Sequence, residues 1–267
     1  SGHFLEGVIN TVGVIAKDRL GYGASGVKGV LLNEKEELVS NFSLNSLGIG
    51  RFTFVPNLQE KYKLVLNNNG KKEERLFTPA IQPQGVLLKV NYNKTSCIVS
   101  VVTNKSSFDS LEKKNFSLSL HNGKAITVIN FTFKNSTTFT KKIPLKILGK
   151  GMNIFTIFDE KNQPLAERLF FNHHGLTIHK SETKSLVKKE DSIHYSILYK
   201  NISNDSLNNV SVSVLPATTV AYQKHSNIIA QTLVQPYIKG RIENSSYYFT
   251  DIDQQKKFDL DNLLITQ

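Results

Sequence analysis

The sequence predicts an all-β protein: a tandem of antiparallel β-sandwich modules with short helices near the C-terminus. Apolar and polar residues alternate with a period of two along many short segments, as half-buried strands require. Gly, Asn and Pro turns separate these segments at intervals of about 8–12 residues, a spacing typical of sandwiches. The chain has 267 residues, which is about the length of two or three such modules.

The first expected module covers residues 1–76. Its strands are expected at residues 27–32, 38–42, 51–55 and 61–66. In the third of these strands Phe52 and Phe54 share one face, so we expect both, together with Tyr62, to fill a core. Gly48 and Gly50 precede that strand, and we expect both to adopt backbone angles that side chains disfavour.

The second expected module covers residues 77–174. Its strands are expected at residues 86–91, 96–103, 115–121, 125–133, 152–158 and 164–171. Asn122-Gly123 is a strong hairpin signal between two of them. The last two strands flank the turn at residues 159–162 and are expected to form a hairpin that closes the module.

The third expected module covers residues 175–267 and ends in a helical segment. Its strands are expected at residues 176–179, 192–200 and 210–214. Residues 227–234 have helical spacing, with Ser226 or Asn227 available as the N-cap, and residues 258–265 suggest a second short helix. The apolar face of that helix needs a neighbour, which we expect in a domain outside this chain. We therefore expect the third module to be truncated.

Composition limits the class of protein. Hydrophobic residues make up 39% of the chain, which is enough for several small cores and excludes a disordered polymer. No run approaches the roughly 18 apolar residues that cross a bilayer, so no transmembrane segment is predicted. No secretory signal opens the chain, which either cytoplasmic residence or removal from a longer precursor would explain, and we expect a segment of a longer exported protein.

The net charge of +11 would suit a nucleic-acid or anionic-surface partner. However, the lysines are spread along the whole chain, without a basic cluster or an RNA-binding aromatic signature. We therefore predict no nucleic-acid partner and place the lysines on strand edges and loops, where they oppose edge-to-edge aggregation.

Candidate chemistry is sparse. The single cysteine, Cys97, excludes an intrachain disulfide and a cysteine-based zinc site, and its apolar context predicts a buried strand residue. His173, His174 and His179 could supply metal nitrogens, but adjacent histidines at a module junction favour loop positions without a ligand role. His121 is expected at a hairpin end.

Two further patterns favour structure over catalysis. Residues 21–26, with Asp18 before them, superficially resemble a phosphate-binding loop, but no Gly-Lys-Ser/Thr and no helix follow, so a turn between strands is expected. No Gly-X-Ser-X-Gly elbow is present. We predict that the chain is not an enzyme and has no catalytic, cofactor-binding or metal-binding residues.

Several segments together resemble the macroglobulin-like (MG2-type) β-sandwich modules of large Bacteroidetes outer-membrane and envelope proteins, which often carry a TonB-receptor-type plug domain. The segments lie at residues 26–30, 47–56 with Tyr62, 164–171, 210–214, 238–244, 247–249 and 259–267. The resemblance implies macroglobulin- or immunoglobulin-like modules. Macroglobulins that trap proteases use a Cys-Gly-Glu-Gln-type thioester, whereas Cys97 lies in Thr-Ser-Cys-Ile-Val, so covalent trapping is not expected.

These observations predict a non-catalytic structural and protein-interaction segment of a larger bacterial envelope protein. We expect it in the periplasm or at the outer-membrane surface of a Gram-negative bacterium, with unidentified protein partners. One alternative is a carbohydrate-binding accessory module, for which Tyr237, Tyr247 and Tyr248 are the only clustered aromatic candidates, although core packing suits them better. Another is a macroglobulin-like protease-inhibitor fragment without a thioester.

Overall fold

The computed structural model describes residues 3–68, 70–178, 182–198, 212, 214–216, 218–219 and 226–267. The chain divides into two compact units, one made of residues 1–174 and 224–267 and the other of residues 175–223. This division differs from three consecutive modules, because residues 224–267 group with residues 1–174. The module boundaries at 76/77 and 174/175 stay a prediction.

The first unit begins with a sandwich of two sheets. Its strands are β1 (Phe4–Leu5), β2 (Asn10–Ile15), β3 (Lys28–Asn33), β4 (Leu38–Ser43), β5 (Ile49–Phe54), β6 (Tyr62–Asn68), β7 (Lys71–Phe77) and β8 (Ile81–Gln82). One sheet has the order β2-β5 and the other β4-β3-β6-β7, and both are antiparallel. The short strands β1 and β8 form a parallel pair.

Aromatic side chains fill the core between these sheets. Phe52 and Phe54 of β5 are both buried, as the alternation predicts, and Tyr62 lies with them. The ring of Phe54 meets that of Tyr62 edge to face, with centroids 5.4 Å apart, and Phe52 stacks on Phe42. Such contacts add to the free energy of area burial alone.

The two glycines before β5 have different roles. Gly48 has a φ of +68°, which confirms the expected left-handed backbone. For Gly50 that expectation is wrong, since its φ is not positive in the described chain. A Cβ atom at Gly50 would lie 2.5 Å from the carbonyl oxygen of Ser43, so the glycine permits a close approach of two backbones.

The second sandwich also has two antiparallel sheets. Its elements are β9 (Val86–Tyr92), β10 (Ser96–Thr103), α1 (Lys105–Leu111), β11 (Phe116–His121), β12 (Ile126–Phe131), β13 (Thr138–Pro144), η1 (Leu145–Ile147), β14 (Gly151–Phe158) and β15 (Pro164–Asn172). The sheet orders are β13-β10-β9 and β12-β11-β14-β15. Both sheets contribute buried residues to one core, which includes Cys97. Burial raises the pKa of its thiol to about 12, and the expectation of a buried strand cysteine is confirmed.

Helices complete the first unit. They are α2 (Ile228–Leu233), η2 (Gln235–Tyr237), η3 (Ser245–Phe249) and α3 (Gln254–Ile265). Asn227 caps α2, because its side chain accepts from the backbone N–H groups of Ile229 and Ala230. Asp253 caps α3 in the same way, so this helix begins four residues before the expected position.

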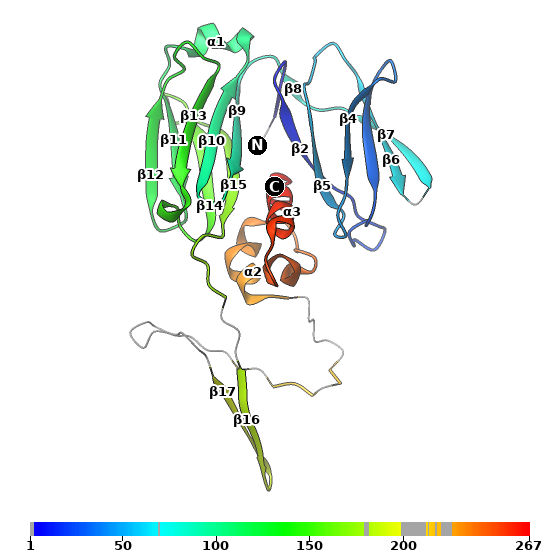
Figure 1. Ribbon diagram of the computed structural model, residues 1–267. Coiled ribbons are helices and arrows are strands. Elements are labelled where there is room, and N and C mark those ends of the chain that lie inside the picture. Colours follow the sequence, from blue (N-terminus) through cyan, green and yellow to red (C-terminus); the bar gives the residue numbers. More distant parts are fainter. Residues whose placement is uncertain are drawn as a thin grey trace. The chain divides into compact units, whose positions relative to one another are not determined.

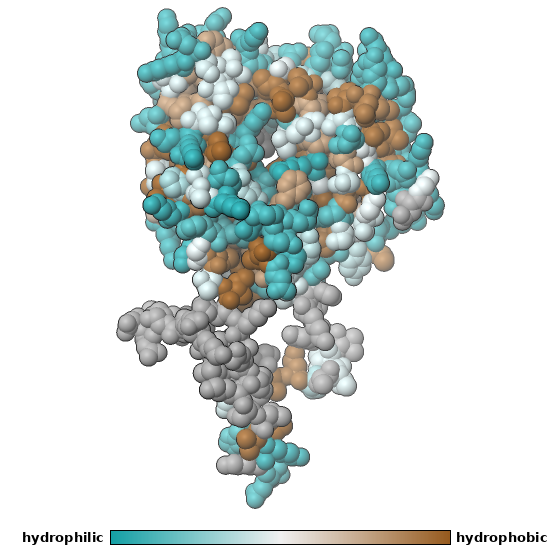
Figure 2. All heavy atoms as spheres, viewed as in Figure 1, coloured by the Kyte–Doolittle hydropathy of each residue, from teal (hydrophilic) through white to brown (hydrophobic). Residues whose placement is uncertain are grey.

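Helix α3 lies between the two sandwiches and contacts β2 and β5 of the first and β15 of the second (Figure 1). The expectation that its partner belongs to a domain outside this chain is therefore wrong. Buried residues occur all around the last turns of α3 and include Asp259, Asp261 and Asn262. Figure 2 shows hydrophilic side chains over much of the visible face of this unit, with hydrophobic ones among them.

The second unit contains a hairpin of β16 (Glu182–Lys189) and β17 (Ser192–Leu198), which pair antiparallel. Residues 176–178 have no strand, so that part of the prediction is wrong, and His179 lies outside the described residues. Most of the expected strand at residues 210–214 also lies outside them.

The all-β fold class is confirmed, with antiparallel sandwich sheets and short helices near the C-terminus. The periodicity did not reveal β2, β7, β13 or α1. Strand β7 has no alternation to detect, since it is charged along most of its length and exposed on both faces. Within the described residues, no helix has the length and apolarity to span a membrane.

Replacing Phe54 with Ala removes a ring from the first core, and we expect it to lower the free energy of unfolding by about 3–5 kcal/mol. Urea denaturation followed by circular dichroism measures this. Leu76→Ala in β7 is the control, because 74% of Leu76 is exposed, and its effect is expected to stay within about 0.5 kcal/mol. Equal losses for both variants would contradict the assigned core.

Candidate functional site

One carboxylate on α3 joins the two sandwiches. Asp261 Oδ2 lies 2.8 Å from Nη1 of Arg51 on β5, and its Oδ1 lies 2.6 Å from Nη2 of Arg168 on β15. Only 8% of the Asp261 and Arg168 side chains is exposed, against 28% for Arg51. Two guanidinium groups from different sandwiches thus share one buried carboxylate. Each of them pairs with one oxygen of the carboxylate, so its negative charge is compensated from both sides.

Further contacts hold the helix in place. The guanidinium of Arg51 lies 4.1 Å above the centroid of the Phe258 ring, which is cation–π geometry. The Asp259 carboxylate accepts from the hydroxyl of Tyr247 at 2.6 Å and from Nε2 of Gln255 at 3.2 Å. Burial, with the hydrogen bond to Asp259, raises the pKa of Tyr247.

The C-terminal end of α3 lies close to β2 because that strand has a glycine there. A Cβ atom at Gly13 would lie 2.7 Å from Cγ2 of Thr266. The backbone nitrogen of Thr266 would lie 3.1 Å from the same Cβ atom, so a larger residue would require at least the Thr266 side chain to move.

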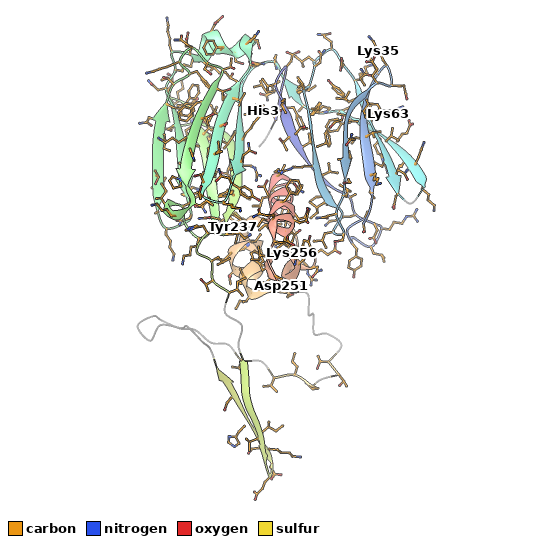
Figure 3. All side chains as sticks on the ribbon, in the orientation of Figure 1. His3, Lys35, Lys63, Tyr237, Asp251 and Lys256 are labelled. Atoms are coloured by element: carbon orange, nitrogen blue, oxygen red, sulfur yellow. The ribbon has the colours of Figure 1, made fainter. Side chains whose placement is uncertain are left out.

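Beside this end of the helix is a basic cleft of about 440 Å³, with walls from β2, β9 and α3. Arg51, Arg168 and Lys89 supply its positive charge. Burial lowers the pKa of Lys89 and that of His3, because it disfavours the charged forms. Nε2 of His3, labelled in Figure 3, is buried without a hydrogen-bond partner in the described part of the chain.

A second depression, the α3–β4 groove, has a volume of about 610 Å³. We define it by Asn41, Ser43 and Asn45 around the end of β4 and by Gln255, Phe258 and Asn262 of α3. Its polar lining is mostly amide and hydroxyl groups. Two of these amides, Asn45 and Asn262, have a buried atom without a hydrogen-bond partner in the described chain.

The predicted histidine positions are only partly confirmed. His173 and His174 follow β15 in a loop, as expected. His174 is exposed, whereas His173 packs on the rings of Phe171 and Phe249. Burial lowers the pKa of His173 to about 4, and the nearby Lys257 ammonium acts in the same direction. Among the described residues no group of three or more His, Cys, Asp or Glu is placed to hold a metal ion.

The glycine-rich loop before β3 is a turn between strands. Oδ1 of Asp18 accepts from the N–H groups of Leu20 and Tyr22 at 2.8 and 2.9 Å, which confirms its role as a turn former. The N–H of Gly23 donates to the Glu243 carboxylate at 2.7 Å. A carboxylate of the chain itself therefore takes the position that an anion has in a phosphate-binding loop.

The three tyrosines do not form an exposed aromatic platform. Tyr248 is buried, as core packing predicts, and Tyr247 is half-buried with its hydroxyl on Asp259. Tyr237, labelled in Figure 3, is half-buried on the wall of a separate cleft beside β15.

Sequence reasoning missed Asp261 and Asn262. A signal was nonetheless present, because Asp259, Asp261 and Asn262 interrupt a run of leucines in a segment with helical spacing. Polar residues inside an apolar helix usually have buried partners.

No protein-family profile matches the chain, and no curated protein does either. Similar solved structures include a tetra-tandem repeat from the extending region of a large adhesion protein, at 9% identity and a TM-score of 0.30, covering 72% of this chain and 70% of that one. The BSP domain of a biofilm-associated protein has 12% identity and a TM-score of 0.30, over 65% and 29% of the two chains. A DUF3823 family protein from Bacteroides ovatus has 12% identity and a TM-score of 0.22, over 59% and 94%.

Likeness at this level carries no argument about function. The fold assignment rests on the strands and sheets of the chain itself, which define a two-sandwich protein with a bridging helix. The resemblance to macroglobulin-like modules stays a prediction.

Replacing Asp261 with Asn removes the charge that Arg51 and Arg168 share. We expect a loss of about 3–5 kcal/mol in the free energy of unfolding, because Arg168 stays buried without a counter-charge. Urea denaturation measures it, with Asp109→Asn on the exposed face of α1 as the control. A loss below about 1 kcal/mol would show that the bridge does not hold the sandwiches together.

The low pKa of His173 makes stability depend on pH. Its folded value of about 4 lies below the ordinary 6.5, so the unfolded chain binds the proton more tightly. The contribution of the neutral His173 side chain to the free energy of unfolding is complete above about pH 6.5. It falls by about 3 kcal/mol in total as the pH drops toward 4. We expect His173→Phe to reduce this pH dependence and His174→Phe to leave it unchanged, as measured by urea denaturation at several pH values.

Proposed function

We propose that the chain is a non-catalytic structural and protein-interaction segment of a larger bacterial envelope protein. Its place is the periplasm or the outer-membrane surface of a Gram-negative bacterium, and its partners are envelope proteins. In this role the two sandwiches act as one body that presents sheet edges to a partner.

The observation that carries the proposal is the edge strand β12. It pairs with β11 on one side and has no strand on the other within the described residues (Figure 1). Its sequence ITVINF has no charge, and Ile126 and Val128 are 69% and 55% exposed. An uncharged, β-branched free edge can pair with an extended strand of another protein.

Strand β7 provides the contrast. It is also an edge strand, but five of its residues are charged: Lys71, Lys72, Glu73, Glu74 and Arg75. Charges on an edge oppose pairing with another chain. The charged edge of β7 is thus protected against association while the uncharged edge of β12 is open to it, which supports a specific use of β12.

The bridge through Asp261 supports the structural part of the proposal. A segment that presents an edge at a fixed orientation must resist bending between its sandwiches. The shared carboxylate and the helix between the sheets supply that resistance, since bending would separate a buried charge from one of its partners.

The test is site-specific photo-crosslinking of the full-length protein in its source bacterium. With the crosslinker at Val128 we expect a discrete product with an envelope protein, and with the crosslinker at Glu74 of β7 we expect none. The product at Val128 should disappear when Ile126 is replaced by Lys. Equal products at both positions, or no product at Val128, would contradict the proposal.

A further inference from the structure

Positive charge is concentrated in the part of the chain that forms the edge strands β12 and β13. Residues 113–158 contain eight lysines and no arginine, aspartate or glutamate, against a net charge of +11 for the whole chain. All eight lysines are exposed, and none has an ion-pair partner among the described residues. They are Lys113, Lys114, Lys124, Lys134, Lys141, Lys142, Lys146 and Lys150. Such a surface attracts a negatively charged partner.

Four of these lysines lie next to the two edge strands or on them. Lys124 precedes the first residue of β12 by two positions, and Lys134 follows its last residue by three. Lys141 and Lys142 belong to β13, which is an edge of the other sheet of this sandwich. The two edges are neighbours, because both strands line one groove. Lysines therefore lie near both ends of the free edge of β12 and on the strand beside it.

This groove offers apolar surface beside the free edge. We define the β12–β13 groove by Asn130 and Phe131 of β12 and by Thr138, Phe139 and Thr140 of β13, and its volume is about 530 Å³. The rings of Phe131 and Phe139 stack with centroids 4.2 Å apart. Phe131 is buried, whereas Phe139 is only half-buried. A side chain of a strand paired with β12 can therefore pack on the Phe139 ring.

Acidic residues are too few to compensate these lysines. Those that flank the segment in the chain are Asp109, Glu112, Asp159 and Glu160. Within the part of the chain that the structure describes, none of them pairs with a lysine of the segment. The Glu112 carboxylate accepts from the N–H of Asn135 at 3.4 Å, so it lies near the loop between β12 and β13. Four carboxylates against eight lysines still leave an excess of positive charge.

A second copy of this chain is a poor partner for β12. Pairing of two β12 strands, parallel or antiparallel, would bring the lysines at both ends of one strand close to those of the other. Like charges opposite each other destabilise a strand pair, and a repulsive element of this kind selects against a wrong partner. A partner strand with the opposite charge is attracted at the same two places.

We infer that the partner of β12 is an extended strand of another protein, with acidic residues on both sides of a short β-branched segment. Its backbone pairs with the free edge of β12. Its carboxylates lie beside Lys124 and Lys134, and one apolar side chain enters the β12–β13 groove against Phe139. The inference rests on the function proposed above and adds the chemistry of the partner. An acidic chain without the β-branched segment has the charge but lacks the group that fills the groove.

Fluorescence anisotropy of the chain with two labelled peptides tests the inference. The acidic probe is Glu-Asp-Val-Thr-Ile-Thr-Val-Asp-Glu, and the basic probe has lysine in place of each acidic residue. We expect the acidic probe to bind at least about tenfold more tightly at about 0.05 M salt, and this difference to shrink at about 0.5 M salt. The acidic probe should also shift the backbone amide NMR signals of β12.

Charge reversal shows which lysines select the probe. Lys124→Glu combined with Lys134→Glu should remove the preference for the acidic probe. The matched control is Lys71→Glu combined with Lys72→Glu, which makes the same change of charge on the edge strand β7 and should leave the preference unchanged. Both double variants should keep the wild-type circular dichroism spectrum.

The inference is overturned if the acidic probe binds no more tightly than the basic one, or if the charge-reversed β12 variant keeps the preference. It is also overturned if polyglutamate or dextran sulfate binds as tightly as the acidic probe. Equal binding of both probes with signal shifts in β12 would overturn the inference alone, because the edge would still pair with a strand. Binding of neither probe would overturn it as well, and the crosslinking product at Val128 then decides separately on the proposed function.

Discussion

The arrangement of the first unit depends on one shared charge. Asp261 pairs with Arg51 of one sandwich and Arg168 of the other, at 2.8 and 2.6 Å. Removing a carboxylate and two guanidinium groups from water is costly, and only near-ideal geometry offsets that cost. The position of α3 is therefore closely constrained, and so are the features that depend on it: the contact at Gly13, the Tyr247–Asp259 hydrogen bond and the grooves along the helix.

The proposed contact surface at β12 does not depend on this constraint. The free edge of β12 is a property of one sheet and would exist in an isolated second sandwich. The α3–β4 groove exists only where the helix meets the first sandwich, since its lining residues come from both.

The sequence predicts local features well, because strand alternation and turn residues act over a few positions. Phe52, Phe54, Cys97 and the cap at Asn227 all follow from such short patterns. Asp261 does not, since its partners are 210 and 93 residues away. Strand β7 was missed because its exposed faces need no apolar alternation. Gly50 was explained wrongly because the backbone that approaches it is set by the turn between β4 and β5. The burial of His173 could not be predicted either, because it depends on Phe249 of the distant helical segment.

The distribution of distances between spin labels on the two sandwiches tests most directly whether Asp261 holds the sandwiches together. In a Cys97→Ala background, labels at Lys72 of β7 and Lys142 of β13 report their separation by pulsed electron paramagnetic resonance. We expect one narrow distribution for the intact bridge and broad ones for Asp261→Asn and for Arg51→Gln. Equally narrow distributions in all three proteins would contradict the bridging role of Asp261.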